Sequence, residues 1–324
     1  MLTPEYVTAL CARTFSERHN QRIEEFRPLP SRQHEMVQFD LLWDTTRGIR
    51  RLPLVARHYV STLSWWRAED RGKAQREVSV TRWLRKQGFP VPEVLAREFD
   101  AHHDVVLYTR LPGQDWSAEG HPFAEVIGPY VERLAWLLHR LHRLRPPEDV
   151  RLVVPTVTLP VAMANLAALA DLIGEPDLST SIERIMGPAC LAEEHPPVLL
   201  HGDYHFSNAL IEDGQQISGI IDWEFSALGD PRWDVANAYM QLVDLDAAGP
   251  AAEFLNAYLH FSRLKFDAPP IYSAVASLQQ WAVSEWLMRK QAAGRSPGFR
   301  LAADLTALRD THRRRAEMAL GWLQ

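Results

Sequence analysis

The sequence predicts an α+β chain of two lobes, in which a small antiparallel sheet with a helix precedes a larger, mainly helical lobe. Three observations predict this class. The chain has 324 residues, which is long enough for two separate cores. Its amino-terminal half contains short strand-like runs around one helical run, and its carboxy-terminal half contains long amphipathic segments. The lobes are expected to span residues 1–111 and 117–324, with residues 112–116 as the hinge or linker.

The first lobe is expected to open with a helix over residues 3–15, because Thr3 is a suitable cap and Pro4 suits a first helical turn. Two strands, a second helix and two further strands follow. The predicted strands cover residues 36–43, 52–60, 94–99 and 105–108, and the second helix covers residues 73–87. Pro112-Gly113 ends this lobe.

The second lobe is expected to begin with a helix over residues 123–144, which has one apolar face. His139 and His142 lie on this helix, where a histidine is usually a hydrogen-bonded core residue rather than a ligand. The other predicted helices cover residues 235–245, 251–263, 271–290 and 299–323.

Composition excludes several classes of protein. The net charge of −6 argues against a general nucleic-acid binder, which normally has a basic surplus. Cys11 and Cys190 are the only cysteines, which excludes a disulfide framework and a cysteine zinc site and fits a reducing cytoplasm. The amino terminus has no signal segment, and the most apolar stretch, residues 152–173, is interrupted by prolines and polar residues. A cytoplasmic protein without a membrane span is therefore expected.

The most informative stretch places three oxygen-bearing side chains around a predicted hairpin. An apolar run, residues 198–200, leads into a loop that contains Asp203. Two β-favouring runs on either side of Asp213-Gly214 then predict a hairpin. This hairpin brings Asn208 and Asp222 almost opposite each other at its open end. A divalent-metal site beside a candidate base is the arrangement that phosphoryl transfer needs.

Three motifs in this stretch resemble those of the aminoglycoside phosphotransferase family, which includes choline kinases and is the small-molecule branch of the protein-kinase-like fold. They are His201-x-Asp203-x-x-x-x-Asn208, Ile221-Asp222-Trp223-Glu224 and Gly229-Asp230-Pro231-x-x-Asp234. The resemblance implies a bilobal protein-kinase-like fold. It also implies a kinase that uses ATP or GTP with Mg²⁺ to phosphorylate a hydroxyl group of an aminoglycoside-, choline- or sugar-like molecule.

The resemblance also implies a role for each matching residue. Asp203 is the catalytic residue that receives the acceptor's hydroxyl proton, and Asn208 and Asp222 hold Mg²⁺. The supporting residues are His201 and His205, which shape the loop, Glu224, which touches the metal through water, Asp230, which caps a turn, and Asp234, which braces the loop.

The nucleotide is expected to contact the first lobe. Arg57, paired with Glu77 on the second helix, is expected to steady the phosphates, with Tyr108 and Leu111 at the hinge. Arg57 departs from the family pattern, which has lysine there, and Lys73 is a candidate substitute cation. The expected nucleotide loop, residues 26–34, contains no glycine, so Ser31 or Gln33 would have to bind a phosphate through its side chain.

Two other functions stay open at this point. Arg57 and the glycine-free loop also fit a pseudokinase that binds nucleotide without transferring phosphate. Asp203-x-His205 also resembles part of a metallophosphoesterase site, although a second cluster of ligands is absent from the sequence. A lone Asp203 is compatible with a turn or cap residue as well. The acceptor, the choice of ATP or GTP and the oligomeric state are not readable from the sequence.

Overall fold

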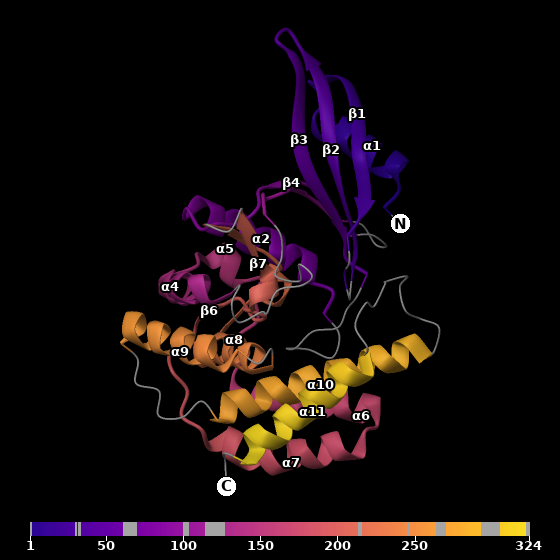
Figure 1. Ribbon diagram of the computed structural model, residues 1–324. Helices are drawn as coiled ribbons and strands as arrows, with labels where there is room; N and C mark the ends of the chain where they lie inside the picture. The colour runs from indigo at the N-terminus through magenta and orange to yellow at the C-terminus, as the bar shows by residue number, and fades with distance from the viewer. Residues whose placement is uncertain are drawn as a thin grey trace.

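The computed structural model describes residues 2–29, 31, 34–60, 70–99, 104–113, 127–212, 216–244, 247–263, 270–292 and 305–321. The described chain forms two lobes, with the strands of a sheet above and a bundle of helices below (Figure 1). The division of the chain at residues 112–116 stays a prediction, since residues 114–116 lie outside the described part.

The first lobe contains a sheet of five strands in the order β1-β2-β3-β5-β4, and every neighbouring pair is antiparallel. Its elements are α1 (Pro4–Thr14), β1 (His19–Pro28), β2 (Glu35–Thr45), β3 (Gly48–His58), α2 (Lys73–Lys86), β4 (Val94–Phe99) and β5 (Asp104–Thr109). The first helix begins as predicted, because the Thr3 side chain accepts a hydrogen bond from the Tyr6 N–H and Pro4 opens the first turn.

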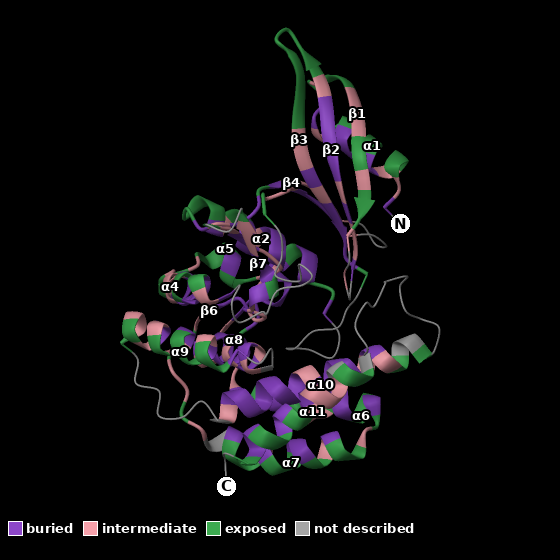
Figure 2. Cartoon of the chain, in the orientation of Figure 1, coloured by how far each residue is buried: buried purple, intermediate pink, exposed green. Residues whose placement is uncertain are grey.

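Strand β1 is the element of this lobe that the sequence did not predict. The expected nucleotide loop over residues 26–34 overlaps it, because β1 runs to Pro28. It is an edge strand without a buried residue, so the alternation of apolar and polar residues that identifies a half-buried strand is absent. Figure 2 shows the contrast between exposed β1 and the buried stretch of β2 beside it.

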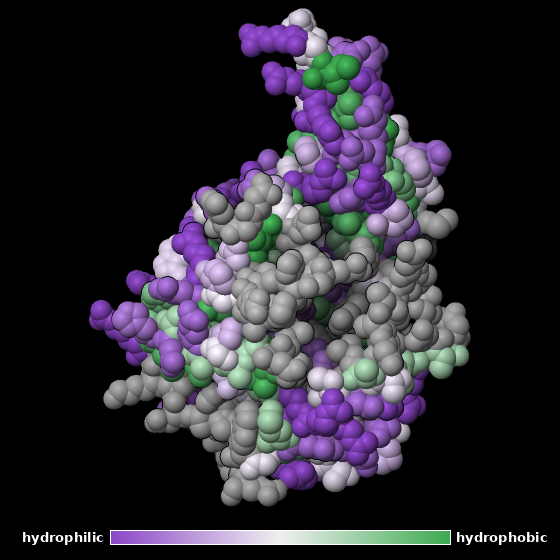
Figure 3. Space-filling model, viewed as in Figure 1, coloured by the Kyte–Doolittle hydropathy of each residue, from purple (hydrophilic) through white to green (hydrophobic). Residues whose placement is uncertain are grey.

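The second lobe consists of helices around two short strand pairs. Its longer helices are α4 (Val131–Arg143), α6 (Leu159–Ile173), α7 (Pro176–Leu191), α8 (Arg232–Asp244), α9 (Ala248–Ser262), α10 (Pro270–Ala292) and α11 (Leu305–Gly321), with η1 (Gly128–Tyr130) and α5 (Glu148–Arg151) as short turns. Helices α6 and α7 were not predicted. Helix α10 is buried along most of its length (Figure 2), whereas hydrophilic residues dominate the surface over α7 (Figure 3).

The two strand pairs position the motifs. The predicted hairpin is present as β7 (Ala209–Glu212) and β8 (Gln216–Ile220), which pair antiparallel; its turn, residues 213–215, lies outside the described residues. The second pair joins β6 (Val198–Leu200), just before the loop with Asp203, to β9 (Ala227–Gly229), just before Asp230. The short turns η2 (Phe206–Asn208) and η3 (Trp223–Phe225) lie beside them. Among the described helices, none has the length and apolar character needed to span a bilayer.

Candidate functional site

The loop after β6 holds Asp203 in a fixed orientation. Its carboxylate accepts a hydrogen bond from the Asn237 amide at 3.3 Å, and its other oxygen lies 3.3 Å from Nε2 of His205. Burial raises the pKa of Asp203, but His205 and the hydrogen bonds outweigh it and leave that pKa below its ordinary value. Gly202, at φ +85°, permits the turn because a Cβ there would overlap the carbonyl oxygen of Phe225. The result is an ionised carboxylate on a rigid loop.

Asp234, at the start of α8, holds this loop through hydrogen bonds to its backbone. Its carboxylate accepts hydrogen bonds from the backbone N–H groups of His201 and Gly202 at 2.7 and 2.9 Å. It also lies 3.2 Å from Nε2 of His142, whose Nδ1 lies 2.7 Å from the hydroxyl of Tyr258. The loop with Asp203 is thus attached to α4, α8 and α9.

His201 connects the loop to the segment that precedes Asp222. Its Nε2 donates to the carbonyl oxygen of Ile221 at 2.9 Å, and its Nδ1 accepts from the Asp203 N–H at 3.3 Å. The ring packs against that of Trp223, tilted by 51°, with 4.4 Å between centroids. Burial lowers the pKa of His201, in agreement with a neutral ring that uses one nitrogen as donor and the other as acceptor.

Asn208 and Asp222 lie at the open end of the hairpin. The Asn208 carbonyl accepts from the Ile221 N–H at 2.9 Å, so the two chain segments are adjacent there. The Asn208 side-chain nitrogen donates to the carbonyl oxygen of Asp203 at 3.0 Å and lies 3.2 Å from Nε2 of His205. This leaves Oδ1 as the Asn208 side-chain atom able to bind a cation. Asp222 is left-handed, at φ +70°, a conformation that aspartate tolerates better than most residues.

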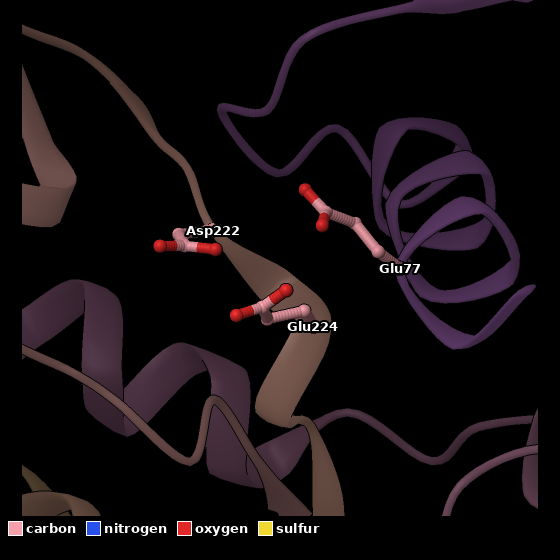
Figure 4. A group of neighbouring side chains, drawn as sticks. All are labelled: Glu77, Asp222 and Glu224. Atoms are coloured by element: carbon pink, nitrogen blue, oxygen red, sulfur yellow. The ribbon is translucent and has the colours of Figure 1, made fainter. Parts of the chain in front are cut away.

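Three carboxylates converge from the two lobes. Figure 4 shows Glu77, on α2, pointing toward Asp222 and Glu224, and ligand oxygens of all three lie within 4.8 Å of one another. Arg57, on β3, is placed among them. Its NH1 lies 3.1 Å from Glu77 and 2.8 Å from Asp222, and its NH2 lies 2.9 Å from Glu224. Burial raises the pKa of Glu77 above its ordinary value, although Arg57 acts in the opposite direction.

Glu224 is buried among basic side chains. Besides Arg57, its carboxylate lies 2.5 Å from Nε2 of His34 and 3.3 Å from Nζ of Lys73. Burial opposes its charge, but His34, Lys73 and Arg57 outweigh this and hold the pKa of Glu224 well below its ordinary value. The predicted contact of Glu224 with a metal through water stays a prediction, since the described contacts of this carboxylate are with these three bases.

The remaining predicted residues have neighbours in or beside the site, and their expected contacts with nucleotide stay predictions. The Tyr108 hydroxyl lies 3.0 Å from that of Tyr59, which donates to Glu77 at 2.5 Å. Leu111 packs so closely on Gly219 that a Cβ there would overlap it. Ser31 accepts from the His34 N–H at 3.2 Å, and Gln33 lies outside the described residues.

Asp230 accepts from the backbone N–H groups of His195 at 2.7 Å and Arg232 at 2.9 Å, in the position of a helix cap. Its burial opposes the charge, but these hydrogen bonds and the Arg232 side chain lower its pKa below the ordinary value.

Four residues of the site were not predicted from the sequence: His34, Tyr59, Asn237 and Tyr258. Asn237 carried a usable signal, because it follows Asp234 by three positions, and residues three positions apart on a helix share a face. Tyr59 carried one too, because it follows Arg57 by two positions and alternate residues of an extended chain share a face. His34 ends the expected nucleotide loop, but nothing in its local sequence indicates a contact with Glu224. Tyr258 reaches the site from a distant part of the chain.

Comparison with known proteins decides the family. Residues 39–274 match the phosphotransferase enzyme family. The chain belongs to this family. It is 30% identical over 195 residues to an aminoglycoside 3'-phosphotransferase of Streptomyces fradiae. The aligned region covers 54% of this chain and 69% of that protein.

Solved structures share the fold at low sequence identity. A thermostable mutant of aminoglycoside phosphotransferase APH(4)-Ia, in a ternary complex with ADP and hygromycin B, has a TM-score of 0.63 at 14% identity over 97% of each chain. Plasmodium vivax ethanolamine kinase has a TM-score of 0.62 at 15% identity, over 91% of this chain and 81% of the other. The predicted fold class and the assignment as a small-molecule kinase are confirmed, and the metallophosphoesterase interpretation is not supported.

Proposed function

We propose that this phosphotransferase moves the γ-phosphate of ATP or GTP to a hydroxyl group of a small molecule, with Asp203 as the base. The observation that carries the proposal is the contact between the base and the candidate metal ligand. The Asn208 amide donates to the carbonyl oxygen of Asp203 at 3.0 Å, so the two side chains start from neighbouring points of one loop.

The oxygen atoms around this loop fit Mg²⁺, which prefers carboxylate and amide oxygens. Asn208 would bind it through Oδ1 and Asp222 through its carboxylate, on a side chain that is 30% exposed. When bound with the nucleotide, Mg²⁺ neutralises charge on the phosphates. Arg57 adds a permanent positive charge next to Asp222, at 2.8 Å, where phosphate oxygens bound to the same metal would be within its reach.

Asp203 orients the acceptor and receives its proton. A carboxylate with a lowered pKa is a weak base, but it is ionised and therefore able to accept a hydrogen bond from the attacking hydroxyl. Asn237 and His205 prevent the carboxylate from rotating. In this family of reactions positioning and charge neutralisation supply most of the rate, and the proton moves late.

The acceptor belongs to the hydroxylated small molecules. The relatives support this class, since their names include an aminoglycoside phosphotransferase and an ethanolamine kinase. Both kinds of acceptor carry amino groups, so aminoglycosides and amino alcohols are the first compounds to test. A cytoplasmic location, where thiols remain reduced, is part of the proposal.

The test is phosphate transfer from ATP and from GTP to a panel of aminoglycosides, amino alcohols and sugars. Once an acceptor is found, Asp203→Ala should lower kcat by roughly 10²- to 10⁴-fold, the range for loss of a general base. Nucleotide affinity, measured by the rise in melting temperature with Mg²⁺-nucleotide, should change little. Asp171→Ala, at an exposed position of α6, is the control. Full turnover by Asp203→Ala would show that Asp203 is not the base. Nucleotide binding by the unchanged protein without transfer to any acceptor would favour a pseudokinase.

A further inference from the structure

Arg57 joins all three carboxylates of the cluster by itself. Its NH1 lies near both Glu77 and Asp222, and its NH2 lies near Glu224. These are the three carboxylates whose ligand oxygens lie close enough together to hold a metal ion. The guanidinium group therefore already occupies the environment that these residues offer to a cation.

We propose that Arg57 acts as an internal cation that keeps free divalent metal out of this cluster until nucleotide arrives. This inference rests on the proposed function, because it assumes that metal and nucleotide bind at Asn208 and Asp222. Metal then enters the site only together with the nucleotide phosphates.

Charge balance requires a cation at this place. Three carboxylates are gathered where the side chains of Glu77 and Glu224 are only 5% and 2% exposed. Burying carboxylates without a partner is costly, so positive charge must accompany them. Lys73 supplies one charge to Glu224, and Arg57 supplies the other to all three. A free divalent ion would have to displace Arg57 or bind beside its positive charge.

The position of Arg57 is fixed from behind. Its guanidinium carbon lies 4.7 Å above the ring centre of Tyr59, which also donates a hydrogen bond to Glu77. Tyr108 in turn lies 3.0 Å from the Tyr59 hydroxyl. The arginine is therefore anchored to the first lobe independently of Asp222.

A lysine would not span this cluster. The planar guanidinium group presents two terminal nitrogens in a fixed fork, whereas an ammonium group is a single point charge. In this chain the fork reaches Asp222 through NH1 and Glu224 through NH2. The departure from the lysine of the family pattern thus has a structural consequence, which is a direct link between the first lobe and the candidate metal ligand.

Nucleotide provides the means of release. Phosphate oxygens are strong bidentate acceptors for arginine. Of the three contacts of Arg57, the one with Asp222 is the most accessible, because the Asp222 side chain is 30% exposed while its two counterparts are almost fully buried. Arg57 is therefore able to exchange Asp222 for a phosphate and keep Glu77, which frees Asp222 to bind the accompanying metal.

The test is a titration with Mn²⁺ alone, in which the electron paramagnetic resonance signal of free Mn²⁺ reports binding. Arg57→Ala should bind Mn²⁺ at least about tenfold more tightly than the unchanged protein does. Coupling between two ligands typically changes affinity by roughly 5- to 150-fold, and this increase lies within that range. Arg57→Lys, which keeps the charge but loses the fork, should lie between them. Adding Asp222→Asn to Arg57→Ala should abolish the gain. Arg51→Ala, which removes an arginine from buried Asp40 on β2, is the matched control and should not change Mn²⁺ binding.

The outcomes separate this inference from the proposed function. If the unchanged protein binds free Mn²⁺ as tightly as Arg57→Ala does, Arg57 excludes nothing and the inference is wrong. If the melting temperature of the unchanged protein does not rise when Mn²⁺ is added together with ATP or GTP, the proposed nucleotide site is wrong instead. Arg57→Met, which keeps most of the unbranched apolar part of the side chain but not its charge, replaces Arg57→Ala if melting curves show that the alanine variant does not fold.

Discussion

Tyr258 places its hydroxyl 2.7 Å from Nδ1 of His142, so that the two ring nitrogens of His142 face Tyr258 and Asp234. Asp234, on the other side of the ring, can only accept, so Nε2 of His142 carries the proton that it donates at 3.2 Å. Nδ1 is then the acceptor for the Tyr258 hydroxyl. Asp234 on α8 thus sets the tautomer of buried His142, and Tyr258 on α9 supplies the donor for its other nitrogen.

Tyr258→Phe should weaken this connection without emptying the core. The change leaves Nδ1 of buried His142 without a donor, which costs about 1–3 kcal/mol of the free energy of unfolding. Because the Asp234 carboxylate accepts hydrogen bonds from the loop N–H groups of His201 and Gly202, its displacement should lower kcat while the KM for nucleotide stays constant. Urea unfolding and steady-state kinetics measure both effects. Tyr6→Phe, which loses a hydrogen bond to Glu98 in the first lobe, should lower stability without lowering kcat. Equal kcat losses in both variants would contradict the positioning role.

Asn237→Ala should affect the base directly. Asn237 donates to the Asp203 carboxylate and helps lower its pKa, so its removal should raise that pKa. The acid limb of the kcat profile should therefore move to higher pH, because Asp203 becomes protonated at a higher pH than before. Rotation of the freed carboxylate should also lower kcat by about tenfold, less than the roughly 10²-fold that a 1 Å displacement can cost.

The control for Asn237→Ala is Gln241→Ala, one turn further along α8. It should leave both the acid limb and kcat unchanged. An unmoved acid limb in Asn237→Ala itself would show that the amide does not act on the base.

Local sequence was sufficient to predict the hairpin and the loop that carry the site. The β7–β8 hairpin and the chain reversal before Asp222 depend on turn residues and short apolar runs, which lie close together in the sequence. The same holds for Thr3 at the start of α1. In these places the turn or cap residues that determine a local structure lie next to that structure in the sequence.

The environment of Glu224 was not predictable in this way. His34 contacts Glu224 across 190 positions of sequence, and Lys73 does so across 151. No short-range pattern records such a contact, because it follows from how the two lobes pack. Strand β1 escaped prediction for another reason: six of its ten side chains are exposed and none is buried, so no alternation of apolar residues marks it.

Gly202→Ala should disable the loop. Gly202 has a positive φ, which costs an alanine about 1–2 kcal/mol, and the added Cβ would overlap the carbonyl oxygen of Phe225. The loop would have to shift and carry Asp203 with it, so kcat should fall by roughly 10²-fold, the cost of a displacement of about 1 Å. Gly174→Ala is the matched control, because Gly174 has φ +68° at the end of α6 with open space around it. It should cost a similar strain and leave kcat intact. Retained activity in Gly202→Ala would mean that the loop is not rigid.

His34→Gln should change how stability depends on pH. Burial lowers the pKa of His34 from 6.5 to about 4, with Arg57 and Lys73 acting in the same direction, although Glu224 opposes it. The geometry agrees, because Nδ1 accepts from the Val60 N–H at 3.3 Å while Nε2 donates to Glu224. Between pH 6.5 and 4 the unfolded chain therefore binds one proton more at this position than the folded protein does. The free energy of unfolding should fall as the pH falls, by about 2 kcal/mol between pH 6.5 and 5 from this group alone.

Glutamine keeps an N–H donor for Glu224 but does not titrate, so His34→Gln should remove that part of the pH dependence. Urea unfolding at pH 7 and pH 5 measures the pH dependence of the free energy of unfolding for the unchanged protein and for His34→Gln. The contributions of other buried histidines such as His201 cancel in the difference between the two proteins. His260→Gln, at an exposed position of α9, is the control and should leave the slope nearly unchanged. A charged ion pair between His34 and Glu224 would have the opposite sign, since a raised pKa makes the folded state more stable as the pH falls. A steeper loss of stability at pH 5 in His34→Gln would therefore identify His34 as protonated.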